Sequence, residues 1–135
     1  MIVVHDLDGG KHNWSFTGKL QNTRANISGL HKKANQLLIE IYPTIPMLQE
    51  VAIPVRRNET LYLDFYIPLL KKAIEVHGEQ HYKFVAHYHN NAMGFMKHKK
   101  RDLDKQEWCS VNSIQYIELP FNETIDEWKD RIVKI

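Results

Sequence analysis

Ionisable side chains interrupt two apolar strand patterns in the stretch LDFYIPLLKKAIEVHGEQHYKF, residues 63–84. Asp64 lies within the first pattern, Glu75 and His77 lie within the second, and His81 follows four residues later. A charged group in a packed strand is costly unless it is paired or binds an ion. A chain that folds around these strands must therefore expose the charges to solvent, pair them, or place a cation between them.

Apolar spacing along the chain predicts an α/β fold. The expected elements are a helix from Ser28 to the prolines at 43 and 46, strands at 48–55, 60–67 and 72–77, a helix at 95–112, a strand at 113–120, and a last helix capped by Thr124. Residues 79–94, which contain several His and Asn, are expected to form a long loop that is either functional or mobile. Residues 1–26 are expected to be an N-terminal arm or a short hairpin, and 27–135 a single domain.

The period of a β-strand predicts how the charged residues face. Alternation places Asp64 on the face that carries Tyr62 and Tyr66, and Glu75 on the face that carries His77. The residues expected opposite Asp64 are Leu63, Phe65 and Ile67. If the two strands pair, Asp64 lies beside Glu75 or His77, and two close carboxylates repel unless a cation lies between them. Carboxylate oxygens with room for water suit Mg²⁺ or Mn²⁺, so the pattern predicts a metal site at Asp64 and Glu75.

Each charged residue also has a simpler interpretation. Asp64 is explained by a solvated strand face, Glu75 and His77 by an edge strand that faces water, and His81 by a polar loop. The occurrence of all these residues on consecutive strands favours a metal site instead. In such a site the metal ion activates a water molecule for attack on a phosphodiester, and His81 accepts the proton of that water.

Composition excludes several classes of protein. The net charge of +2 is too small to indicate nucleic-acid binding by itself. A single cysteine, Cys109, excludes an internal disulfide and is typical of a reducing compartment. The start, MIVVHDLDGGKHNW, lacks the pattern of a signal peptide, and no apolar run approaches the ~20 residues that span a bilayer. We expect a soluble intracellular protein without a membrane partner.

Three segments carry a family resemblance: LDFYIP at 63–68, IEVHGEQH at 74–81 and RDLDKQEW at 101–108. Together they resemble the PD-(D/E)xK nucleases of the restriction-endonuclease-like fold. The details are similar to the branch of very-short-patch repair endonucleases and phage homing endonucleases with an EDxHD signature. The resemblance covers residues 28 to about 128 and implies that fold's core, a helix, a three-strand meander, a helix and a strand, here followed by a C-terminal helix.

The resemblance implies a metal-dependent DNA endonuclease that hydrolyses phosphodiester bonds, with Mg²⁺ or Mn²⁺ as cofactor and DNA as partner. Asp64 matches the central metal ligand, and Glu75 stands at the second acidic position. His81 matches the candidate general base, while His77 and Asp102 would complete or orient the site. A stand-alone nuclease of this size is typical of a phage or mobile element, which implies the cytoplasm of a bacterial host.

The first helix departs from the family pattern, which begins with a glutamate there. His31 or Lys32 lies near that position, whereas Glu40 lies at the far end of the helix and Glu50 begins the next strand. His31 would replace the carboxylate as a ligand or contact phosphate, or the contribution of this helix is missing. Glu50 is a fallback ligand if the first strand runs beside the second.

Basic residues follow one side of the helix expected at 95–112: Lys97, Lys100, Arg101 and Lys105. A solvated helix face explains them when they are taken alone. Beside a metal site they are predicted, with His31, to contact the DNA backbone.

Two alternatives to a nuclease remain open. A catalytically inactive DNA-binding module on the same fold would follow from the missing first-helix glutamate. A zinc-stabilised interaction domain would use His81, His87, His89 and Cys109, although their spacing matches no standard zinc motif.

Overall fold

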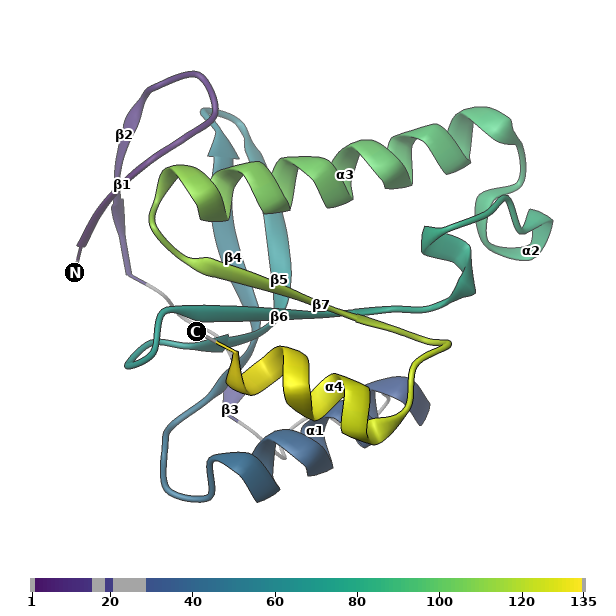
Figure 1. The fold of residues 1–135 in the computed structure, drawn as a ribbon. Helices are drawn as coiled ribbons and strands as arrows, with labels where there is room; N and C mark the ends of the chain where they lie inside the picture. The colour runs from purple at the N-terminus through teal and green to yellow at the C-terminus, as the bar shows by residue number, and fades with distance from the viewer. Residues whose placement is uncertain (1, 16–18, 21–28, 135) are drawn as a thin grey trace.

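The computed structural model describes residues 2–15, 19–20 and 29–134, with the backbone alone at 19–20 and 87–88 (Figure 1). In chain order, its elements are β1 (Ile2–His5), β2 (Lys11–Trp14), β3 (Lys19–Leu20), α1 (Gly29–Ile41), β4 (Leu48–Arg56), β5 (Glu59–Ile67), β6 (Lys72–His77), the short 3₁₀ helix η1 (Glu79–His81), α2 (Ala86–His89), α3 (Ala92–Val111), β7 (Gln115–Pro120) and α4 (Ile125–Val133). The mixed α/β fold and the predicted order of the main elements from α1 onward are confirmed.

A five-stranded sheet of order β3-β4-β5-β6-β7 forms the centre of the molecule. β4, β5 and β6 pair as an antiparallel meander, while β7 pairs parallel to β6. α3 lies in the connection from β6 to β7, because a parallel pair needs a long crossover. β6 is the most enclosed strand, and all six of its residues are buried.

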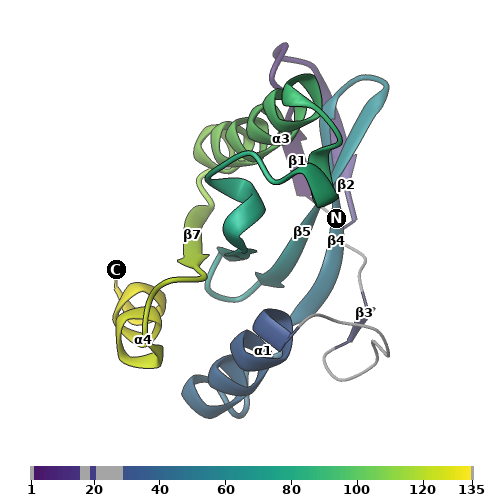
Figure 2. The same ribbon diagram turned by 90° about the vertical axis from the view of Figure 1, so that its right-hand side faces the viewer.

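Helices cover both faces of the sheet. Figure 2 shows α3 on one side and α1 with α4 on the other. On the α1 and α4 side, Leu38 and Trp128 pack on Phe65 and Ile67 of β5. On the α3 side, a second core cluster gathers residues of β4 and β5 around Trp108. β6 lies between two apolar layers, so a charged side chain on it must find a partner within the protein.

The N-terminal residues 2–14 form the hairpin that was one of two expectations for this region. β1 and β2 pair antiparallel, and Val4 and Trp14 are buried in the core cluster on the α3 side. The indole N–H of Trp14 donates to the carbonyl of Ala52 on β4 at 2.9 Å. The predicted boundary between residues 26 and 27 and the predicted cap at Ser28 lie outside the described residues.

The segment from 79 to 94 differs from the long irregular loop that was expected. It contains η1 and α2, and α3 begins at Ala92 instead of residue 95. Asn91 caps α3, because its side chain accepts the N–H of Gly94 at 2.9 Å. Gly94 is required there, since a Cβ would lie 2.2 Å from the carbonyl oxygen of His89. Residues that are common in loops here build a helix start, which explains the wrong boundary.

The expected alternation of β5 is wrong at Asp64. Leu63 and Tyr66 both pack in the cluster on the α3 side, whereas Phe65 and Ile67 face α1 and α4. The pairing of β4 with β5 omits the Glu50–Asp64 position, and Glu50 has a left-handed φ of 53°. The pleat therefore reverses where Glu50 meets Asp64, which a period of two does not foresee.

No helix in the described part of the chain has the length and apolar character that a membrane span requires.

Candidate functional site

Asp64 and Glu75 meet where β5 and β6 separate, and Glu75 is one of the two neighbours that strand pairing allowed for Asp64. Regular pairing of the two strands stops at Phe65 and Ile74. Beyond that point the backbone N–H of Asp64 donates to Oε2 of Glu75 at 2.6 Å, and the N–H of Val76 donates to Oδ2 of Asp64 at 2.9 Å. Each carboxylate thus accepts a backbone N–H of the other strand, in place of the carbonyl that regular pairing would supply. We call Asp64 and Glu75 the carboxylate pair.

Lys105 of α3 neutralises the buried member of this pair. Its Nζ lies 2.6 Å from Oε1 of Glu75, whose side chain is 2% exposed. Burial, followed by the charge of Asp64, raises the pKa of Glu75 to about 7, and Lys105 opposes that rise. Burial acts to lower the pKa of Lys105, but the charges of Glu75 and Asp64 outweigh it and raise the pKa. Lys105 was expected at DNA phosphate, yet the structure places its ammonium inside the protein.

His31 of α1 approaches the carboxylate pair from the other side of the sheet. Its Nε2 lies 3.8 Å from Oδ1 of Asp64, and its ring packs on Phe65 at 5.0 Å between centroids. The helix therefore presents an imidazole to Asp64 where the family pattern has a glutamate. Glu50, the predicted fallback ligand, lies on β4 at the position facing Asp64.

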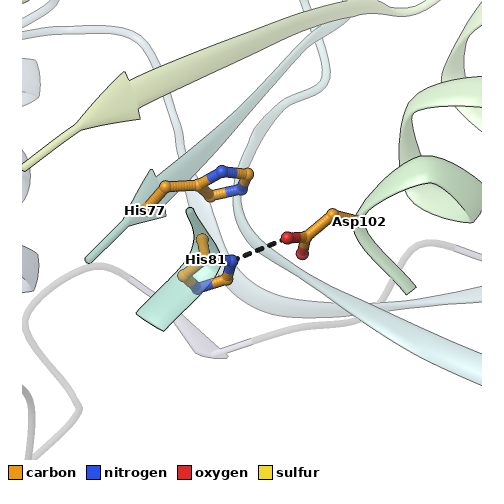
Figure 3. Close-up of side chains that lie close together, drawn as sticks. All are labelled: His77, His81 and Asp102. Atoms are coloured by element: carbon orange, nitrogen blue, oxygen red, sulfur yellow. Dashed lines mark hydrogen bonds and ion pairs between the residues drawn. The ribbon is translucent and has the colours of Figure 1, made fainter. Parts of the chain in front are cut away.

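His77, His81 and Asp102 form a second group, which we call the histidine cluster. They come from the end of β6, from η1 and from α3 (Figure 3). Nδ1 of His81 donates to Oδ2 of Asp102 at 2.8 Å, and the two imidazoles stack at 4.1 Å with 8° between their planes. One ligand atom from each of the three residues lies within 4.8 Å of the others. The sequence singled out all three residues, and the fold brings them together.

Residues that the sequence analysis missed complete the surroundings of the histidine cluster. Oε1 of Glu118 lies 3.5 Å from Nδ1 of His77, and the Tyr116 hydroxyl lies 3.3 Å from Nε2. The Tyr82 hydroxyl donates to the other oxygen of Glu118. Glu118 carries the same signal as Asp64, because it is a lone carboxylate within the apolar strand pattern of β7. These side chains line a cavity of about 240 Å³ that also touches Lys99 of α3.

Burial and neighbouring charges perturb the histidine cluster. Burial, followed by the nearby His81, lowers the pKa of His77, so its imidazole is held neutral. Burial acts to raise the pKa of Asp102, but the hydrogen bond and charge of His81 outweigh it, and the pKa is lowered. The imidazole of His77 is therefore neutral, and the carboxylate of Asp102 is ionised. In these states each group can bind a metal ion or accept a proton.

The basic residues predicted on α3 divide into two groups. Lys97, Lys100 and Arg101 are exposed, as a contact with a nucleic-acid backbone requires. Lys105 is directed to Glu75. The exposed three remain candidates for phosphate contact.

The predicted four-residue zinc set is not assembled among the described side chains. Cys109 is fully buried beside Trp108, and burial raises the pKa of its thiol to about 12. His89 instead packs on His98 at the other end of α3, 4.9 Å between ring centroids. Since a helix rises about 1.5 Å per residue, His98 and Cys109 are separated by roughly 16 Å along α3. The side chain of His87 lies outside the described part of the chain.

Comparisons with known proteins find viral relatives. The chain is 41% identical over 64 residues to "Uncharacterized protein 307L" of Invertebrate iridescent virus 6, covering 47% of this chain and 32% of the relative. It is 32% identical over 68 residues to "Uncharacterized protein 033L" of Invertebrate iridescent virus 3, covering 50% and 34%. It is 39% identical over 65 residues to "Uncharacterized protein 094L" of Frog virus 3, covering 47% and 42%.

The chain therefore spans less than half the length of the curated relatives it matches. No protein-family description matches the chain, and no solved structure matches it. These relatives belong to viruses named after invertebrates and a frog, whereas a phage or mobile element of a bacterium was expected.

Proposed function

We propose that this chain is a metal-dependent DNA endonuclease with a restriction-endonuclease-like core. The observation that carries the proposal is the carboxylate pair, in which Asp64 of β5 and Glu75 of β6 meet where the two strands separate. The order α1, β4, β5, β6, α3 and β7, with helices on both faces, supports the same core. This order and this placement of acidic residues are what the resemblance implies.

The carboxylate pair offers oxygen atoms, which are the donors that a hard cation prefers. Asp64 is 27% exposed at its side chain and offers Oδ1 toward His31, while Glu75 offers Oε1, which Lys105 now contacts. Asp64 and Glu75 would hold Mg²⁺ or Mn²⁺, with Lys105 displaced from Oε1. Such an ion supplies charge for the phosphate oxygens and acidifies a bound water.

His81 is the proposed general base. Because its Nδ1–H donates to Asp102, the ring orientation is fixed and Nε2 is left to accept a proton. Asp102 thus acts as the positioning residue for His81, and His77 supports the ring by stacking on it. Lys97, Lys100 and Arg101 would contact the DNA backbone from the exposed side of α3.

The decisive experiment is a cleavage assay. Purified protein is incubated with supercoiled and branched DNA in Mg²⁺, Mn²⁺ or EDTA, beside Asp64→Asn and the exposed control Glu107→Gln. We expect metal-dependent nicking that Asp64→Asn abolishes and Glu107→Gln retains. Nicking that is unchanged in Asp64→Asn, or that persists in EDTA, contradicts the assignment.

A second candidate is a DNA-binding module without catalysis. The observation that favours it is the 2.6 Å contact of Lys105 with Glu75, because an internal ammonium already supplies the positive charge that a metal would bring. The same assay separates the two candidates. DNA binding that weakens with salt, without cleavage in any metal, supports the binding module.

A further inference from the structure

Among the described residues, no lysine or arginine forms an ion pair with a carboxylate at the histidine cluster, although Lys105 acts on Asp102 and Arg131 acts on Glu118 at longer range. Among the described residues, Asp102 is ion-paired only with His81, and Glu118 only with His77. Lys99 lines the same cavity, but its ammonium lies over the ring of Tyr82, 5.5 Å from the centroid. The carboxylate pair differs, because it has Lys105. Two carboxylates beside two imidazoles form an arrangement that a divalent cation completes.

The donor atoms define which cation fits. Two imidazole nitrogens with carboxylate oxygens suit Zn²⁺ and similar transition metals, whereas Mg²⁺ prefers oxygen donors and water. His77, His81 and Asp102 supply the nitrogens and one carboxylate, and Glu118 stands beside His77 as a fourth donor. The set therefore selects a different class of metal from the one expected at the carboxylate pair.

The three side chains lie near enough to bind one ion after they rotate. The three ligand atoms lie within 4.8 Å of one another. Around a tetrahedral ion with bonds of about 2.1 Å, ligand atoms lie roughly 3.4 Å apart, so rotation of the side chains closes the site. The adjoining cavity of about 240 Å³ leaves room for that rotation and for entry of the ion. β6, η1 and α3 hold the three residues in place, which limits the entropy lost on binding.

We propose that His77, His81 and Asp102 bind a transition-metal ion of the Zn²⁺ class, with Glu118 as the adjoining donor. This site is distinct from the Mg²⁺ site proposed at Asp64 and Glu75, and it does not rest on nuclease activity. Because coordination takes the one lone pair of the His81 imidazole, a metal ion bound here prevents His81 from acting as the general base.

The test is metal binding by the full chain. Protein stripped with EDTA is titrated with Zn²⁺ by calorimetry in the presence of excess Mg²⁺, and with Co²⁺ by visible absorption. The variants are His77→Ala, Asp102→Asn and Glu118→Gln, with His98→Ala as the control that removes another α3 histidine. Circular dichroism confirms that each variant is folded, and Asp102→Asn, which keeps its size, serves if His77→Ala unfolds.

We expect the wild type to bind Zn²⁺ despite Mg²⁺, and His77→Ala and Asp102→Asn to bind it at least roughly tenfold more weakly. His98→Ala should bind as the wild type does. Equal affinity in the wild type and folded Asp102→Asn, or loss of binding in His98→Ala alone, overturns the proposal. Asp64→Asn should retain Zn²⁺ binding, so failure of the nuclease proposal and failure of this one give different results.

Discussion

Two groups of acidic residues lie near α3 and are neutralised in different ways. In the carboxylate pair, the buried Glu75 has a lysine ammonium at 2.6 Å and a backbone N–H at the same distance. At the histidine cluster, the described ion-pair contacts of Asp102 and of the adjoining Glu118 are with imidazoles, and Glu118 also accepts the Tyr82 hydroxyl. Glu75 and Glu118 are partners in the register of β6 and β7, so the contrast arises between neighbouring positions. Lys105 neutralises the carboxylate pair within the fold. The histidine cluster has no such internal ammonium in ion-pair contact, so it can still bind an added metal ion or proton.

The largest expected effect comes from removing the internal cation. Lys105→Met should lower the free energy of unfolding by about 3 kcal/mol or more, because it leaves the buried Glu75 without its partner. The measurement is urea denaturation at pH 8, with the exposed Lys97→Met as control. The double variant Lys105→Met, Glu75→Gln should recover part of the loss. Equal stability of Lys105→Met and Lys97→Met would show that the two acidic groups are not neutralised differently.

The next effect is a pH dependence that belongs to Glu75. Its pKa is raised from 4.5 to about 7 in the folded protein, so the folded state binds the proton more tightly than the unfolded state. This contribution to stability is complete below pH 4.5 and is lost as the pH rises through 7, by roughly 3 kcal/mol. Unfolding free energies at pH 5 and pH 8 should differ less in Glu75→Gln than in the wild type. Glu107→Gln, an exposed control on α3, should keep the wild-type difference; an unchanged difference in Glu75→Gln contradicts the assignment.

The smallest effects are expected in the histidine cluster. Asp102→Asn should cost about 1.5 kcal/mol of stability, because it weakens a charged hydrogen bond to His81. Glu118→Gln should cost about 0.5 kcal/mol, since that carboxylate is partly exposed. Thermal denaturation in the absence of metal compares the stability loss of these two variants with that of Lys105→Met. A cost for either variant as large as that of Lys105→Met would remove the distinction between the two groups.

The elements and the carboxylate pair were predictable from local pattern. β4, β5 and β6 are consecutive strands joined by short turns, so the sequence brings Asp64 near Glu75 or His77 without knowledge of the remaining chain. It does not choose between the two, and the register of β5 with β6 selects Glu75. The reversal at Glu50 was not predictable, because a glutamate with positive φ leaves no signal in the sequence.

Contacts that depend on α3 and β7 were harder to predict. Glu118 reaches His77 through a parallel register set by the long crossover, and no local period reports that register. Lys105 stands on a helix with several basic residues, and nothing in its spacing distinguishes the buried one from Lys97 or Lys100. Only packing of α3 on the sheet selects it.

The long crossover also sets an order of assembly. β5 and β6 are joined by a short turn and can close early, whereas α3 must fold back over the sheet after the chain from His77 onward has been made. Until α3 docks, Glu75 is open to water and is expected to behave as an ordinary carboxyl. Docking of α3 then buries Glu75 beside Lys105, raises its pKa to about 7, and brings Asp102 to His81 in one event. The rate of this last folding step is therefore expected to depend on pH, because docking changes the proton affinity of Glu75.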